Sequence, residues 1–173
     1  MSAKPKSIAL PSLAAALVVA TAGFGAPPAA AAPKAAKVVV VKHEQRLYLM
    51  RDGEVLKSYR VSLGRRPRGT KLYEGDGRTP EGRYVLDARN PDSRFYRAFH
   101  VSYPNAADRE RARGLHQTAG GLIMVHGLPL ERPNWGSDHW MYNWTTGCIA
   151  VTDREMDEIW DSVDVGTPIE IRP

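Results

Sequence analysis

Short runs of strand-forming residues, separated by turn signals, are the feature that most limits the fold of this chain. Residues 38–41 are β-branched throughout, and the runs 46–50 and 55–61 flank Asp52-Gly53. An Asp-Gly pair between two such runs is a strong hairpin signal, because the tight turn needs positive φ angles that these residues tolerate. Runs of this length are typical of strands, so the start of the domain is predicted to be β.

The same pattern continues to the end of the chain, with strand-length runs at residues 83–88, 98–101, 122–125, 148–151 and 169–171. Residues 64–82 are rich in glycine, proline and charge, and they are predicted to form a long loop. A second loop, which carries several aromatic residues, is expected between residues 128 and 143. No internal repeat accompanies these runs, and the chain is long enough for only one core. A single, mainly β domain is therefore predicted.

Two short helices are predicted on the outside of this domain. Residues 104–113 contain good helix formers, with a proline near the first turn. Thr152 is followed by Glu155 three residues later, which is the pattern of a capping box at a helix start. An apolar stripe at helical spacing then follows, formed by Met156, Ile159, Trp160 and Val163.

The N-terminal part of the chain has the composition of a secretory signal peptide. Lys4 and Lys6 precede an apolar stretch from residue 8 to residue 24, and small residues follow. The stretch is short and broken by glycine and proline, so export with cleavage is expected and a retained membrane span is not. The mature protein is therefore expected in the periplasm or cell envelope.

Cleavage is expected after Ala31, with Ala26 and Ala36 as alternatives. This divides the chain into a signal peptide (1–31), a short linker (32–36) and a folded domain (37–173).

The net charge of +5 does not by itself indicate a nucleic-acid partner. The basic residues are scattered, apart from a cluster at Arg65, Arg66, Arg68 and Lys71, and no aromatic-and-basic groove pattern accompanies them. No nucleic-acid binding is therefore expected. A positive protein equally suits an anionic cell envelope.

Cys148 is the only cysteine of the chain. A lipid anchor near the N-terminus is therefore excluded. An unpaired thiol in an exported protein is buried and inert, linked to another molecule, or a nucleophile. Composition does not choose among these three.

The neighbours of Cys148 favour a catalytic thiol partnered by His126. His126 ends an apolar run and is followed by Gly127, whereas Cys148 begins the next run and is preceded by Gly147. A thiol with a pKa of about 8.5 needs a base to become a nucleophile near neutral pH. The Gly127 carbonyl would orient the second ring nitrogen of His126, and the amides of Gly147 and Cys148 would stabilise an oxyanion. On these residues alone, a buried and inert Cys–His pair is an equal alternative.

A zinc site is not expected from the remaining histidines. His100, His116, His126 and His139 could join Cys148 as ligands, but no pair among them has a short ligand spacing.

Two segments together resemble the catalytic signature of the L,D-transpeptidase (YkuD-like) family. They are residues 123–127 (IMVHG) and 145–150 (TTGCIA), and the similarity extends to residues 62–64, 75–84, 102–105 and 166–169. The chain is most similar to the small periplasmic murein L,D-transpeptidase-like subgroup. The resemblance implies a single-domain L,D-transpeptidase-type β-sandwich or barrel with two short peripheral helices.

The resemblance also implies a peptidoglycan L,D-transpeptidase. Cys148 would form a thioester with the carbonyl of a diaminopimelate residue in a stem peptide, with His126 as general acid and base, and the acyl group would pass to an amine. Tyr103, Thr145 and Thr146 are expected to contact substrate. The family implies no metal and no organic cofactor. The expected partners are peptidoglycan stem peptides, with a cross-linked envelope protein as a further candidate acceptor.

Three alternatives stay open beside this interpretation. Many members carry a histidine directly before the Gly-Cys pair, where this chain has Thr146. This departure leaves room for an amidase that cleaves peptidoglycan or protein–peptidoglycan cross-links. A papain-like peptidase is disfavoured because its cysteine precedes its histidine in the chain. A non-catalytic wall-binding module would not need a thiol beside a histidine.

Overall fold

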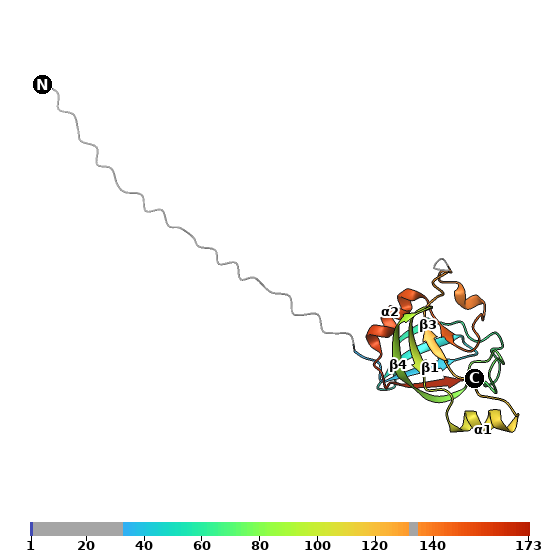
Figure 1. Cartoon of the computed structure of the whole chain (residues 1–173). Coiled ribbons are helices and arrows are strands. Elements are labelled where there is room, and N and C mark those ends of the chain that lie inside the picture. The colour runs from blue at the N-terminus through green and yellow to red at the C-terminus, as the bar shows by residue number, and fades with distance from the viewer. Residues whose placement is uncertain (2–32, 132–134) are drawn as a thin grey trace. The chain divides into compact units, whose positions relative to one another are not determined.

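The computed structural model describes Met1 and residues 33–131 and 135–173 (Figure 1). The cleavage positions Ala26 and Ala31, with nearly all of the predicted signal peptide, lie outside the described residues. The end of the predicted linker already contacts the folded domain. Ala35 is buried, and its amide donates to the Ser162 carbonyl at 2.7 Å.

The mainly β fold is as predicted, and within residues 33–131 and 135–173 eight strands form one mixed sheet. The strand order is β3-β2-β1-β8-β4-β5-β6-β7. Parallel pairs join β1 to β8 and β6 to β7, and the other neighbours are antiparallel. The strands are β1 (Lys37–Val41), β2 (Arg46–Arg51), β3 (Glu54–Arg60), β4 (Gly82–Ser93), β5 (Tyr96–Val101), β6 (Met124–His126), β7 (Ile149–Ala150) and β8 (Pro168–Arg172).

The two outer strands of this order are brought together by the segment that follows β3. Ser62 and Ala150 exchange two backbone hydrogen bonds of 3.0 and 2.9 Å, which forms an antiparallel bridge to β7. A second bridge pairs Gly64 with Thr145. Because these bridges connect one end of the strand order to the other, the sheet curls into a ring, as the β-sandwich or barrel prediction requires.

The predicted hairpin is formed by β2 and β3. Asp52 and Gly53 have φ angles of 51° and 86°, the positive values that a tight turn between twisted strands requires. Arg46 pairs with Arg60 at the other end of the hairpin, so the chain leaves β3 beside the start of β2.

Both predicted helices are present, and they lie on different sides of the sheet (Figure 1). Helix α1 (Ala106–Gly114) begins two residues later than predicted, because Asn105 takes the N-cap position and forms a capping box with Asp108. Helix α2 (Asp153–Ser162) has the predicted capping box, in which the Thr152 hydroxyl accepts from the Glu155 amide. Its buried face packs Met156 and Ile159 into the core.

The strands nearest the candidate site differ in length from the predicted ones. β6 starts only at Met124, because Leu122 has a φ of 55° and is 75% exposed, so the apolar run is not extended throughout. β7 is reduced to Ile149 and Ala150. The hairpin of β4 and β5 is longer than predicted. Phe95 lies at its tip.

Candidate active site

The site is built at the parallel pairing of β6 with β7. Val125 pairs with Ile149 and His126 with Ala150. Side chains alternate between the two faces of a strand, so Cys148, two residues before Ala150, shares a face with Ala150. Ala150 is level with His126, and the pairing therefore directs the Cys148 and His126 side chains to the same face.

His126 is held as a neutral base. Its Nδ1 lies 2.7 Å from the Gly127 carbonyl oxygen. A carbonyl only accepts, so Nδ1 carries the proton and Nε2 keeps its lone pair. Only 2% of the residue is exposed, and this burial lowers the pKa of His126 to about 4. At neutral pH the imidazole is therefore uncharged and able to take a proton at Nε2.

Aromatic rings enclose the imidazole. Phe95 lies over it at a centroid distance of 4.5 Å, and Trp144 meets it edge-on at 5.7 Å. Trp135 packs on Trp144 at 5.0 Å. These rings exclude water from His126, and this exclusion is the physical cause of its low pKa.

The Gly127 carbonyl is itself fixed from both sides. The Gly127 amide donates to the Arg97 carbonyl at 3.2 Å, and the Leu128 amide donates to Asp153 Oδ1 at 2.8 Å. A side chain at position 127 has no room, because a Cβ atom there would lie 2.5 Å from the same Asp153 oxygen. Position 127 therefore requires glycine for close packing.

Thr145 stabilises the turn before Cys148 through two hydrogen bonds. Its Oγ1 accepts from the Gly147 amide at 3.1 Å and donates to the Cys148 carbonyl at 2.8 Å. Gly147 has a φ of 142° and packs so closely on Arg78 that a Cβ atom would lie 2.8 Å from the Arg78 carbonyl oxygen. The geometry thus requires glycine at position 147.

Of the two amides predicted to face an oxyanion, the structure favours the one at Cys148. The Gly147 amide is already engaged by Thr145. The Cys148 amide forms no hydrogen bond with any residue that the structure describes. An amide that is not yet used is the one that can donate to a developing charge.

The Cys148 thiol is protonated in this state. Its sulfur lies 3.6 Å from the Leu122 carbonyl, to which a thiol donates. Burial raises the pKa of Cys148 above its ordinary value, and the Met124 amide and the charge of Lys71 oppose this only in part. No hydrogen bond joins the sulfur to His126 among the described residues. Such contacts often tighten only when substrate binds.

The other predicted substrate contacts lie in different surroundings. Thr146 is exposed beside the nucleophile, whereas Thr145 is buried in the turn. Tyr103 lies in the core with 3% of its surface exposed, and its hydroxyl donates to the Ala119 carbonyl at 2.9 Å. Tyr103 therefore supports the chain behind the site, and no substrate can reach it in this structure.

The loop at residues 64–81 forms one wall of the site, and a buried carboxylate holds it. Asp76 accepts from the Leu72 and Arg78 amides at 2.7 and 3.0 Å and forms an ion pair with Lys71 at 2.9 Å. Both charged side chains are at most 4% exposed. These contacts lower the pKa of Asp76 although burial acts to raise it.

Sequence reasoning did not identify Phe95, Asp153 or the Lys71–Asp76 pair as parts of the site. Asp153 follows the capping residue Thr152, and that position alone accounts for an acidic residue in the first turn of a helix. Asp76 lies in the segment that resembles the family's glycine-rich loop. The sequence gives no signal for Phe95, because only the hairpin brings it to His126.

Two kinds of feature are absent from residues 33–131 and 135–173. No three His, Cys, Asp or Glu side chains gather there in a way that could hold a metal ion. No helix in that part of the chain is long and apolar enough to cross a membrane.

Comparison with known proteins gives a consistent family. The sequence profile of the L,D-transpeptidase catalytic domain (YkuD) matches residues 35–171. YafK of Escherichia coli K12, whose name assigns it to the L,D-transpeptidases, is 31% identical over 132 residues. That alignment covers 73% of this chain and 46% of YafK. The chain thus spans about half the length of this curated relative.

Solved structures show the same fold. The helical cell shape determining protein Pgp2 from Campylobacter jejuni is 29% identical, with a TM-score of 0.57 over 78% of this chain and 46% of Pgp2. An L,D-transpeptidase from Xylanimonas cellulosilytica is 21% identical, with a TM-score of 0.51 over 81% of this chain and 61% of that one. At that identity the second match supports the fold only.

The neutral state of both side chains predicts a pH profile for alkylation. Only the thiolate reacts with iodoacetamide, and a raised pKa leaves little thiolate at pH 7. The alkylation rate of Cys148 is therefore expected to keep rising with pH beyond about 8.5, the pKa of an ordinary thiol. Intact-mass spectrometry measures it. A plateau near neutral pH that disappears in His126→Asn would instead show a preformed thiolate–imidazolium pair and contradict the prediction.

Proposed function

The chain belongs to the L,D-transpeptidase (YkuD) catalytic-domain family, and from this membership we propose that it is a cysteine-dependent acyltransferase that cross-links peptidoglycan. We place it in the cell envelope, where peptidoglycan is found, after removal of the predicted signal peptide. Stem peptides are the donor, and the acceptor is an amine of a second stem peptide or of an envelope protein.

One observation carries this proposal. His126 has its Nδ1 hydrogen fixed on the Gly127 carbonyl, and the pairing of β6 with β7 directs its ring to the same face as the only thiol of the chain. An inert core histidine would not need a defined tautomer with Nε2 left as the acceptor. A neutral base beside a thiol is what acyl transfer requires.

The first half of the reaction forms a thioester. His126 Nε2 takes the thiol proton as the Cys148 sulfur attacks the diaminopimelate carbonyl carbon, and the carbonyl oxygen becomes an oxyanion near the Cys148 amide. When the intermediate collapses, the bond to the D-alanine nitrogen breaks. The proton held at Nε2 passes to that nitrogen, which leaves as an amine.

The second half uses the same groups in reverse. The acceptor amine gives a proton to His126 Nε2 and attacks the thioester carbonyl. The C–S bond breaks, the new amide forms, and the proton returns to the Cys148 sulfur. Since neither half changes an oxidation state, the side chains and the two peptides are sufficient for the chemistry.

Hydrolysis of existing cross-links is the second candidate function. Thr146 occupies the position directly before Gly147-Cys148 where many members carry a histidine, and it is exposed beside the nucleophile. A hydroxyl there would hold a water molecule near the thioester, and water in place of the amine gives an amidase with the same two catalytic residues.

The nucleophile is tested by covalent labelling with a carbapenem, whose lactam carbonyl acylates a catalytic thiol. The wild-type protein is expected to gain the mass of one carbapenem, and Cys148→Ala is expected to gain none, because the chain has no other thiol. His126→Asn should still be labelled, but more slowly. A labelled Cys148→Ala protein with unchanged circular dichroism would overturn the assignment.

The direction of the reaction is tested on purified sacculi. Mass spectrometry of the released muropeptides is expected to show new cross-linked dimers with wild-type protein and none with Cys148→Ala. Loss of existing cross-links without new dimers would favour the amidase. Products that are the same with Cys148→Ala and with wild type would favour a wall-binding module.

A further inference from the structure

A hollow in the loop at residues 64–81 is lined almost entirely by arginine. Its lining residues are Arg66, Pro67, Arg68 and Arg78, and its volume is about 410 Å³. None of these arginines forms an ion pair within residues 33–131 and 135–173. Like charges around one hollow repel each other, and a bound anion would remove that cost.

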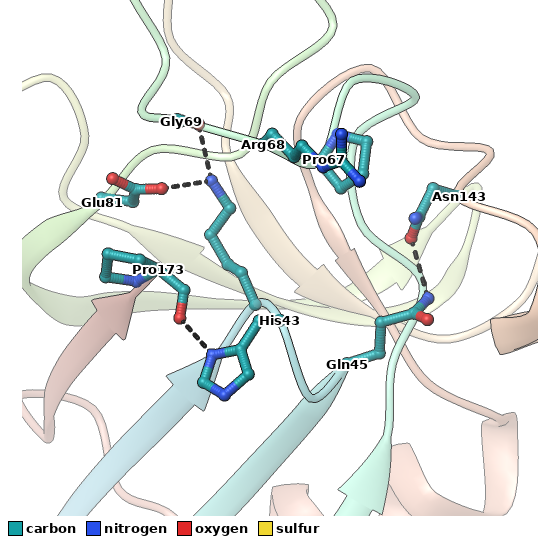
Figure 2. Close-up of a pocket in the computed structure, with 9 residues that line it drawn as sticks. His43, Gln45, Pro67, Arg68, Gly69, Glu81, Asn143 and Pro173 are labelled. Atoms are coloured by element: carbon teal, nitrogen blue, oxygen red, sulfur yellow. Dashed lines mark hydrogen bonds and ion pairs between the residues drawn. The ribbon is translucent and has the colours of Figure 1, made fainter.

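Apart from the shared Arg68, the neighbouring pocket, which also shares Pro67 with this hollow, is lined by no unpaired lysine or arginine among the described residues (Figure 2). Its buried cation, Lys42, already contacts Glu81 at 2.8 Å and the carbonyls of Gly69 and Thr79. Figure 2 shows the polar groups on its floor satisfied in pairs, His43 with Pro173 and Gln45 with Asn143. The uncompensated positive charge is therefore on the side of Arg66 and Arg78.

Hydrogen bonds hold the backbone at Arg66 and Arg78. The Arg66 amide donates to the Gly77 carbonyl at 2.9 Å, and the Arg78 amide donates to the buried Asp76 carboxylate. These contacts fix the backbone of Arg66 and Arg78 before any ligand arrives, so only the side chains have to be ordered when an anion binds.

The same loop is joined to the nucleophile turn. The Arg65 amide donates to the Thr145 carbonyl at 3.0 Å, and the Arg78 carbonyl packs directly on Gly147, the residue before Cys148. A carboxylate on a peptide whose carbonyl lies at Cys148 therefore falls within reach of the arginine-lined hollow. Guanidinium groups bind carboxylates through paired hydrogen bonds.

We propose that Arg66, Arg68 and Arg78 form a subsite that binds a free carboxylate of the acyl-donor peptide. This proposal rests on the proposed function, and it specifies that the acyl-donor peptide must carry a free carboxylate. A donor whose carboxylates are amidated binds more weakly, whereas the chemistry at Cys148 is unchanged once such a donor is bound.

The test uses thioester formation at Cys148 by three synthetic stem tetrapeptides. One has all carboxylates free, one is amidated on the diaminopimelate side chain, and one is amidated at the terminal D-alanine. With wild-type protein, one amidated peptide is expected to have a KM about tenfold higher than the free peptide, and its identity shows which carboxylate is bound.

Arg66→Gln/Arg68→Gln is expected to raise the KM of the free peptide by a similar factor while kcat stays the same and the amidated peptide is unaffected. Arg109→Gln/Arg113→Gln, which removes two exposed charges from α1, is the matched control and should change neither constant. Equal KM changes for free and amidated peptides would overturn the subsite. Absence of any thioester in the wild-type protein would instead overturn the proposed function.

A second inference follows from the peptide bond between Gly127 and Leu128. Its carbonyl accepts from His126 Nδ1, and its amide donates to Asp153 Oδ1 at 2.8 Å. The two groups belong to one rigid plane, so fixing the amide fixes the carbonyl. The Thr152 hydroxyl already caps helix α2, so this oxygen of Asp153 is not needed for capping.

We infer that Asp153 is a positioning residue that sets the His126 tautomer through this plane. Asp153→Ala is expected to lower kcat about ten- to a hundredfold with little change in KM, and to shift the His126 ¹⁵N resonances toward a mixture of tautomers. Asp153→Asn keeps the Oδ1 acceptor but not the charge, and it should retain most of kcat.

If the carboxylate acts only on the dipole of α2, Asn and Ala are equally deficient and the ¹⁵N resonances stay unchanged. That result would overturn the inference. Urea unfolding of both variants separates a loss of stability from a loss of positioning.

Discussion

The parallel pairing of β6 with β7 is the contact on which the candidate site depends. The pairing is short, because β7 has only two residues. Contacts with residues outside the two strands therefore help to hold it. The bridge of Ser62 with Ala150 holds the other side of β7, and the Val151 amide donates to the His126 carbonyl at 2.9 Å. Without this pairing, the side chains of Cys148 and His126 would not be held on the same face of the sheet.

Cys148 and His126 are supported by different parts of the chain. The loop at residues 64–81, which is held by the buried Asp76, packs against Gly147 on the Cys148 side of the site. Phe95 and Asp153 reach the histidine side from the β4–β5 hairpin and from α2. The glycines at 127 and 147 are needed because backbone and carboxylate atoms approach where a Cβ would lie. Both are packing requirements imposed by this arrangement.

Burial sets the resting electrostatics of the site. It disfavours the charged forms of both groups, which lowers the pKa of His126 and raises that of Cys148. Both side chains are therefore neutral near pH 7, and in the proposed reaction the thiol loses its proton only as it attacks the substrate carbonyl. The charge of Lys71 acts against the rise in the pKa of Cys148, although Lys71 is itself paired with Asp76.

Local patterns in the sequence determined the mainly β class, the Asp52-Gly53 hairpin and the capping box of α2, because each depends on neighbouring residues. The start of β6 was predicted wrongly, because Leu122 has a positive φ, a conformation that leucine rarely adopts and that its residue type does not predict. The identity of the thiol and the histidine as candidates also came from the sequence, through single occurrence and adjacent glycines.

Only the tertiary structure decided what surrounds those two residues. No spacing rule could select Phe95 or Lys71, because both lie far from Cys148 and His126 along the chain. Asp153 lies in the first turn of α2, where an acidic residue is expected for the helix alone, so its contact with the Leu128 amide could not be inferred. Likewise, only the structure shows that Tyr103 lies in the core and that the Gly147 amide donates to Thr145. The physical reason is the same in each case: burial and hydrogen-bond partners are set by non-local packing, which short-range sequence patterns do not contain.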